Sequence, residues 1–112
     1  MASVGSIDLL DETITASKNG DKKGLQLGWD SFVGFMRASN SNMTSIDCDI
    51  EHSADGVTWV TLASLPQLTA DGSSIIQIPN TTNVLPNVRA VPTFVGTDVE
   101  LLVRLHYDGD RA

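Results

Sequence analysis

Residues 44–59 read TSIDCDIEHSADGVTW, and this stretch decides the fold. Ile46, Cys48 and Ile50 alternate in it with acidic residues at positions 47, 49 and 51. Side chains of a β-strand point alternately to opposite faces of the sheet. The alternation therefore predicts a half-buried strand with one apolar face and one solvated face.

The same stretch continues into a turn. Asp55-Gly56 separates the first strand from a second strand-like run, residues 57–62. Asp-Gly between two such runs is a strong hairpin signal, because glycine accepts the positive φ of a tight turn. We therefore predict a β-hairpin with its tip at residues 54–56.

The C-terminal part of the chain has the same character. Residues 88–94 and 99–107 are apolar-alternating runs, and Val95-Gly96-Thr97-Asp98 separates them. This pattern predicts a strand pair joined by a turn. Pro92 lacks a backbone donor, which predicts an edge strand or a bulge at that position.

The remaining signals are weaker. The only helix candidate is short, residues 7–13, and the other segments with a regular pattern are strand candidates. Two segments rich in polar residues, 17–24 and 39–42, are predicted to be a loop and a turn. Seven or eight short strands predict an all-β fold, an antiparallel, jelly-roll-like β-sandwich. We expect an N-terminal arm, residues 1–11, and one sandwich domain, residues 12–112. The weaker strand candidates are residues 12–16, 25–27, 31–38 and 74–78.

The composition of the chain argues against several classes of function. The 112 residues fit one domain, and 41% hydrophobic residues supply a core without a disulfide or metal. Seven basic residues against fourteen acidic ones, a net charge of −7, argue against nucleic acid as a partner, because DNA binding needs basic residues that displace counterions. No apolar run approaches the roughly 20 residues that span a membrane, and residues 1–5 do not resemble a secretory signal.

No sequence motif points to catalysis. His52 and His106 lie in no metal-binding motif, and we expect both to be solvent-facing strand residues. The single cysteine, Cys48, is expected to be a buried small hydrophobic residue in a chain that folds in a reducing compartment. The sequence therefore predicts no enzyme, no catalytic residues and no cofactor.

Three carboxylates, those of Asp47, Asp49 and Glu51, lie about 7 Å apart on one strand face. A calcium site is one interpretation, since Ca²⁺ prefers oxygen ligands. The favoured interpretation is a charged sheet face opposed by basic residues of neighbouring strands, Arg104 or Arg37. No metal site is predicted.

The two tryptophans also leave alternatives open. Trp59 follows the hairpin tip and either packs as core, the favoured interpretation, or stays exposed as a sugar-stacking platform. Trp29, between Gly28 and Asp30, is a candidate anchor for a partner surface, because tryptophan is enriched at binding hot spots.

A family resemblance rests on residues 50–59, IEHSADGVTW, with the pattern apolar-x-x-Ser-x-Asp-Gly-x-x-Trp. The pattern is similar to discoidin-like jelly-roll domains and to a group of small bacteriophage structural proteins. The second resemblance covers most of the chain. Its further motifs are Asp8-Leu9-Leu10-Asp11, Thr13-Ile14-Thr15, Val88-Arg89-Ala90, Gly96-Thr97 and the final alternating strand.

The resemblance implies a capsid decoration or cement protein, or a related head or tail accessory protein. It implies synthesis in the host cytoplasm, a place on the capsid surface of the virion, the major capsid protein as partner, and a homotrimer. Ile7, Leu9 and Leu10 of the arm, together with Trp29, are the candidate partner-binding residues; the alternative is that the arm packs on its own sandwich. A second hypothesis is a carbohydrate-binding or tail or head appendage module that contacts the host surface, with Trp29 and Trp59 as platforms.

Overall fold

The structure, a computed structural model, describes the backbone of residues 2–25, 31–78 and 84–110, and the side chains of residues 5–25, 31–78 and 84–107. These residues form strands and no helix, so none of them builds a membrane-spanning helix. The all-β prediction is confirmed, and the one helix candidate, residues 7–13, lies within a strand. The strands are β1 (Ala2–Ile14), β2 (Lys23–Gly24), β3 (Ser31–Ser53), β4 (Val60–Leu68), β5 (Gly72–Ile78) and β6 (Asn87–Asp110).

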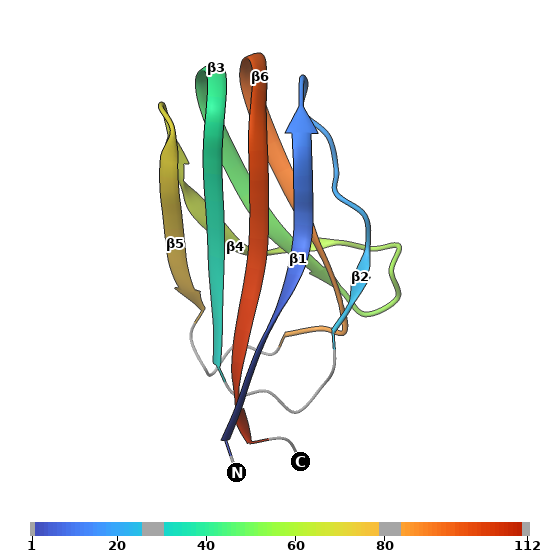
Figure 1. Cartoon of the computed structure of the whole chain (residues 1–112). Coiled ribbons are helices and arrows are strands. Elements are labelled where there is room, and N and C mark those ends of the chain that lie inside the picture. The colour runs from blue at the N-terminus through green and yellow to red at the C-terminus, as the bar shows by residue number, and fades with distance from the viewer. Residues whose placement is uncertain (1, 26–30, 79–83, 111–112) are drawn as a thin grey trace.

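The two longest strands, β3 and β6, determine the architecture. They pair antiparallel with each other from Ser31 opposite Asp108 to Ser53 opposite Asn87. The ribbon that they form doubles back on itself, so that each strand runs through one layer, bends, and returns through the other (Figure 1).

The bend lies where the β3–β6 register shifts, between residues 39 and 45 of β3. Asn40 adopts φ +48° and Gly96 adopts φ +150° there. A Cβ atom on Gly96 would lie 2.5 Å from the Cα of Met43. Only glycine allows the two backbones to approach this closely while the ribbon turns.

The doubled ribbon produces two layers of four strand segments each. The front layer contains β5, residues 31–39 of β3, residues 98–110 of β6, and β1; the back layer contains β4, residues 43–53 of β3, residues 87–95 of β6, and β2. The antiparallel, jelly-roll-like sandwich is confirmed, and the seven or eight predicted strands include both halves of β3 and of β6.

Two segments predicted to be turns between separate strands are bends within single long strands. Residues 39–42 and 95–98 are bends inside β3 and β6, and the runs 88–94 and 99–107 pair with β3 rather than with each other. The sequence signals for a bend and for a turn coincide, because both need polar residues and glycine.

The core lies between the layers. Its most deeply buried members include Ile46, Ile50, Val103 and Leu105, each 0% exposed, and Cys48 and Leu101 at 1%. These six residues are the inward-facing positions that the alternation predicts, and their burial is confirmed.

Residues 1–11, expected to be an arm, lie within β1 from Ala2 onward, and β1 pairs with β6 along its length. A bulge between Asp8 and Leu10 turns both Leu9 and Leu10 inward, at 1% and 7% exposure. The alternative left open for this segment, packing on its own sandwich, is the arrangement that the structure shows. Two adjacent inward residues are what a bulge permits and a regular strand does not.

Four smaller predictions concern strand limits. The strand expected at residues 12–16 begins earlier and ends at Ile14. The strand expected at 25–27 is instead Lys23–Gly24; Leu25 follows it, and residues 26 and 27 lie outside the described residues. The strands expected at 31–38 and 74–78 are confirmed within β3 and β5.

At Pro92, β6 pairs with β3 alone, since β2 pairs with β6 only at residues 87 and 88, and this local edge agrees with the prediction. The carbonyl of Ala90 accepts a hydrogen bond from the Gly20 N–H at 2.7 Å, and the Phe94 N–H donates to Ser17 Oγ at 2.8 Å. Backbone groups at positions 90, 92 and 94 therefore face residues 17–20 rather than β3. At that edge the missing N–H of proline breaks no ladder bond.

Candidate binding surface at the β3–β4 hairpin

The hairpin between β3 and β4 is closed by a loop whose backbone is held by side chains. His52 pairs with Val60 at its base, which confirms the predicted hairpin. The second strand begins at Val60 rather than at Val57, so residues 57–59 belong to the loop. Ser53 Oγ accepts hydrogen bonds from the N–H groups of Gly56 at 2.9 Å and Asp55 at 3.2 Å. Gly56 adopts φ +78°, the conformation for which the sequence selects glycine here.

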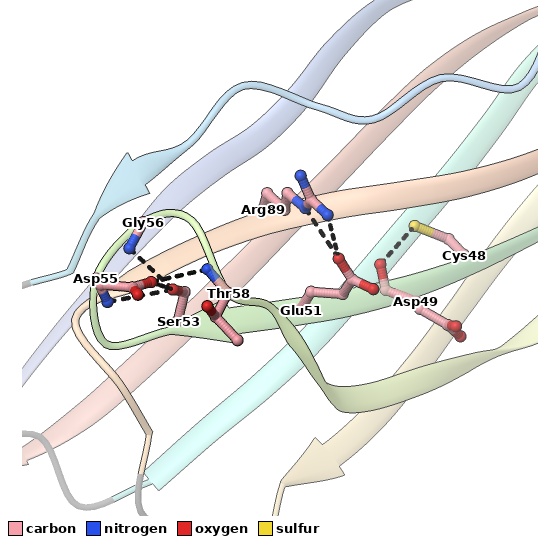
Figure 2. Close-up of polar contacts among 8 residues, drawn as sticks. All are labelled: Cys48, Asp49, Glu51, Ser53, Asp55, Gly56, Thr58 and Arg89. Carbon is pink, nitrogen blue, oxygen red and sulfur yellow. Dashed lines mark hydrogen bonds and ion pairs between the residues drawn. The ribbon is translucent and has the colours of Figure 1, made fainter.

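Asp55 is the second side chain that fixes the backbone of the loop by hydrogen bonds. Its Oδ1 accepts hydrogen bonds from the N–H groups of Val57 and Thr58, both at 2.8 Å, and from Ser53 Oγ at 2.9 Å. Figure 2 shows the bonds from Thr58 and Ser53. The Thr58 and Val57 bonds are the largest causes that lower the pKa of Asp55 to about 2, because they stabilise the ionised carboxylate.

The loop is also fastened to the sheet. Ser53 is 0% exposed, and its carbonyl accepts a hydrogen bond from Asn87 Nδ2 at 3.2 Å. Asn87 is the first residue of β6 and lies opposite Ser53 in the ladder. The hairpin tip is thus fixed at its root by β6.

Apolar side chains project from this fixed loop. Val57 is 80% exposed and Val60 is 53% exposed. The hydrogen bonds that order the Val57 backbone therefore leave its side chain outside the core. An ordered loop that presents an exposed aliphatic group is suited to protein contact, because little conformational entropy remains to be lost on binding.

Next to the loop, Arg89 of β6 joins two partners. Its guanidinium carbon lies 4.3 Å from the centroid of the Trp59 ring. Its Nε and Nη2 donate to Glu51 Oε1 at 2.9 and 2.7 Å (Figure 2). Trp59 is half-buried and does not belong to the core cluster of the described residues. One face of its indole is covered by Arg89, so the ring is neither core nor an open platform.

The row of carboxylates has different partners from those predicted. Glu51 pairs with Arg89, and Asp47 accepts a hydrogen bond from Gln67 Nε2 at 3.0 Å. Arg104 and Arg37 lie in the front layer, and Arg104 instead binds Asp8 at 2.6 Å. Within the part of the chain that the structure describes, no group of three or more metal-ligating residues is assembled.

The two histidines differ. His106 is exposed, as predicted. His52 is 8% exposed, so the solvent-facing prediction is wrong. Its Nδ1 accepts a hydrogen bond from the Leu85 N–H at 3.0 Å, and burial lowers its pKa. The segment before β6 covers this end of the strand, which alternation within β3 does not reveal.

Cys48 is buried, as predicted. Burial raises the pKa of its thiol to about 12. The thiol therefore stays protonated at neutral pH, where a thiolate would be the reactive form.

The predicted partner-binding residues do not form one exposed surface. Leu9 and Leu10 are buried and Ile7 packs against the core, while Trp29 lies outside the described residues. Sequence reasoning missed Val57 and Arg89. The position of Val57 beside the Asp-Gly tip was a usable signal for exposure, whereas the pairing of Arg89 with Glu51 depends on the β3–β6 register.

No protein-family model matches the sequence, and no curated protein matches it. Among solved structures, the chain is similar to the exported protein XepA of PBSX (12% identity, TM-score 0.65), covering 96% of this chain and 38% of XepA. It is similar to VP2 of the infectious bursal disease virus subviral particle (11% identity, TM-score 0.60), with 96% of this chain and 32% of VP2 covered. It is also similar to a Bacillus endospore appendage, from disulfide-linked pili (11% identity, TM-score 0.56), with 95% and 87% covered. The chain thus spans about a third of XepA and of VP2, and these likenesses show a shared fold.

Proposed function

We propose that the chain is a structural protein of a virus particle, a capsid decoration or cement protein that binds the major capsid protein on the outer head surface. The observation behind the proposal is the hairpin tip: a loop fixed by Ser53 and Asp55 that exposes Val57. The phage-protein resemblance of the same residues supports it. So does the fold shared with VP2 of a viral particle and with a pilus subunit.

The exposed valine at the hairpin tip indicates how strong a single contact with the capsid would be. Burying a valine side chain against a partner contributes about 1.5–3 kcal/mol, so one such side chain changes affinity roughly 10- to 100-fold. Many copies on a symmetric shell add avidity to weak single contacts. The proposal therefore needs only a small contact patch for each copy.

A binding assay tests the proposal. Particles of the virus or prophage that encodes the chain, prepared without this gene, are mixed with the purified chain and sedimented. We expect the wild type to bind the particles and Val57→Asp to bind at least about tenfold more weakly. Val95→Asp is the matched control, because Val95 is 52% exposed and lies at the bend between the layers.

Two outcomes would overturn the proposal. One is that native particles contain no copies of the chain by mass spectrometry; the other is that Val57→Asp binds like the wild type. An electron cryo-microscopy reconstruction of the particle distinguishes head from tail. The homotrimer that the resemblance implies at the particle surface stays a prediction, and the same reconstruction tests it.

A carbohydrate-binding or appendage module is the second candidate. A shallow groove of about 240 Å³ favours it, on the outer face of the front layer. Its lining includes the charged and hydroxyl groups of Thr13, Arg37, Ser39 and Glu100. A glycan array with Arg37→Ala as comparison tests this candidate, and the absence of any glycan that binds the wild type more tightly than the variant removes it.

A further inference from the structure

The free edge of β5 differs from the other strand edges of the sandwich. In the described part of the chain, β5 forms a backbone ladder with β3 alone, and no strand pairs with its opposite edge. Its contact with β4 includes a side-chain hydrogen bond, in which Ser74 Oγ donates to the Pro66 carbonyl at 2.7 Å. Its residues, GSSIIQI at 72–78, include no charged residue and no proline. Its central residue, Ile75, is 63% exposed.

The other long edge strands, β1 and β4, have features that hinder pairing with a further chain, and β2 has only two residues. β1 is bulged between Asp8 and Leu10 and has the charged residues Asp11 and Glu12. β4 contains Pro66 and two register irregularities against β3. Bulges, charges and proline are the usual protections of an edge. β5 has none of the three, so it is an unprotected template for another strand.

We propose that β5 pairs antiparallel with β5 of a second copy of this chain, about a two-fold axis at Ile75. In that register all seven residues of each strand have a partner, with Ile75 opposite Ile75 and Gly72 opposite Ile78. The front layers of the two copies then form one continuous sheet. A two-fold contact requires a self-complementary patch, and a strand centred on its own apolar residue provides it.

The outer face of the front layer supports the same contact. Phe35 of β3 lies opposite Ile75 in the ladder and is half-buried. Pairing at β5 would place Phe35, Ile75 and their two counterparts in one apolar row across four strands. Neighbouring aromatic and β-branched side chains of this kind stabilise a sheet.

Charge favours β5 over other places for a second copy. Each chain has a net charge of −7, so two copies repel where their acidic residues face each other. β5 itself is uncharged. Asp71 directly precedes it and accepts hydrogen bonds from Ser41, and Arg37 lies opposite Ser73 in the ladder. Contact at β5 therefore keeps the acidic positions of β1 and of the back layer away from the second copy.

The test is the mass of the purified full chain in solution. We expect sedimentation equilibrium from about 10 μM to about 1 mM to show a reversible dimer of two 12.0 kDa chains. Ile75→Lys should weaken dimerisation at least about 100-fold, because two lysines would face each other in place of two buried isoleucines. Ile75→Thr keeps strand propensity and should weaken it about tenfold. Val95→Lys, a substitution at a comparably exposed valine on the bend, should leave the mass unchanged.

Hydrogen exchange gives a second readout. Amides of β5 that point away from β3 should exchange more slowly as the wild-type concentration rises, and they should not do so in Ile75→Lys. Circular dichroism melts establish that each variant is folded. A wild type that stays monomeric, a trimer, or a dimer that persists in Ile75→Lys and Ile75→Thr would overturn the proposal. The proposal does not rest on the capsid role, because a dimer that binds no particle would leave it intact.

Discussion

The guanidinium carbon of Arg89 lies 4.3 Å from the centroid of the Trp59 ring, while the same guanidinium binds Glu51. The stack joins β6 to the chain just before β4, across the outer face of the back layer. The charged side chains of Arg89 and Glu51 are only 20% exposed. Partial burial strengthens the attraction between the two charges relative to a pair in open water. When either partner is removed, the other charge stays partly buried without a partner, which lowers the free energy of unfolding.

Removing Arg89 should therefore destabilise the fold. We expect Arg89→Ala to lower the free energy of unfolding by about 1–3 kcal/mol, since Glu51 loses its charged partner and Trp59 loses its stack. Arg89→Lys should recover only part of the loss, because lysine keeps the charge but not the planar fork. Urea denaturation measures both. The control is Arg37→Ala, because this exposed arginine forms no ion pair or hydrogen bond with another described residue. An equal loss in that control would contradict the prediction.

Gly56 should resist substitution because of its backbone angle. Its φ of +78° is one that β-branched residues adopt only with strain. Gly56→Val should cost about 1–2 kcal/mol, observed as a lower melting temperature. Gly24→Val is the control, since a Cβ atom at Gly24 meets nothing within 4 Å. Equal melting of the two variants would rule out a strained turn at Gly56.

Protonation of Asp55 at low pH should lower the stability of the folded chain. Its pKa falls from 3.8 to about 2 on folding. The ionised carboxylate therefore contributes stability that is fully present above about pH 4 and is lost as the pH falls toward 2. Asn at position 55 does not titrate, so the melting temperature of Asp55→Asn should fall less steeply than that of the wild type between pH 4 and 2. Parallel curves would exclude this role for Asp55.

Truncation of the N-terminus should affect stability as well as any binding. Leu9 is 1% exposed in the core, so Leu9→Ala should cost about 2–5 kcal/mol. Deletion of residues 1–11 removes most of β1 from the edge of the front layer and should lower the melting temperature further. Ser6→Ala, an exposed position on β1, serves as control. A deletion variant that melts like the full chain would show that β1 contributes little to the fold.

Cys48 should be protected from thiol reagents in the folded chain. Its pKa of about 12 and its 1% exposure leave little accessible thiolate at pH 8. We expect negligible labelling of the native chain and one label per chain in urea, measured by mass spectrometry. Fast labelling of the native chain would indicate local opening of the β3–β6 ribbon around Cys48.

Properties of a residue and its near neighbours in the chain predicted much of this fold. The inward positions Ile46, Cys48 and Ile50 followed from the two-residue period of a strand, and the hairpin tip followed from Asp55-Gly56. The edge position of Pro92 followed from its missing donor. Each of these properties depends on a residue and its immediate neighbours in the chain.

The partners of each strand depended on the tertiary structure. The predicted cations for Glu51 are wrong, because Arg89 becomes its neighbour only through the β3–β6 register. The prediction of a solvent-facing His52 is wrong, because the residue that covers it, Leu85, lies 33 positions away in the chain.

The sequence by itself determined that the chain is all-β, that the alternate side chains of residues 46–50 and 101–105 face inward, and where the β3–β4 hairpin turns. The tertiary structure decided that β3 and β6 each bend through both layers, that a bulge in β1 buries Leu9 and Leu10 together, and that β5 keeps a free edge. The physical reason is that side-chain alternation and backbone φ are set within a few residues, whereas strand neighbours are set by the packing of distant segments around one shared core.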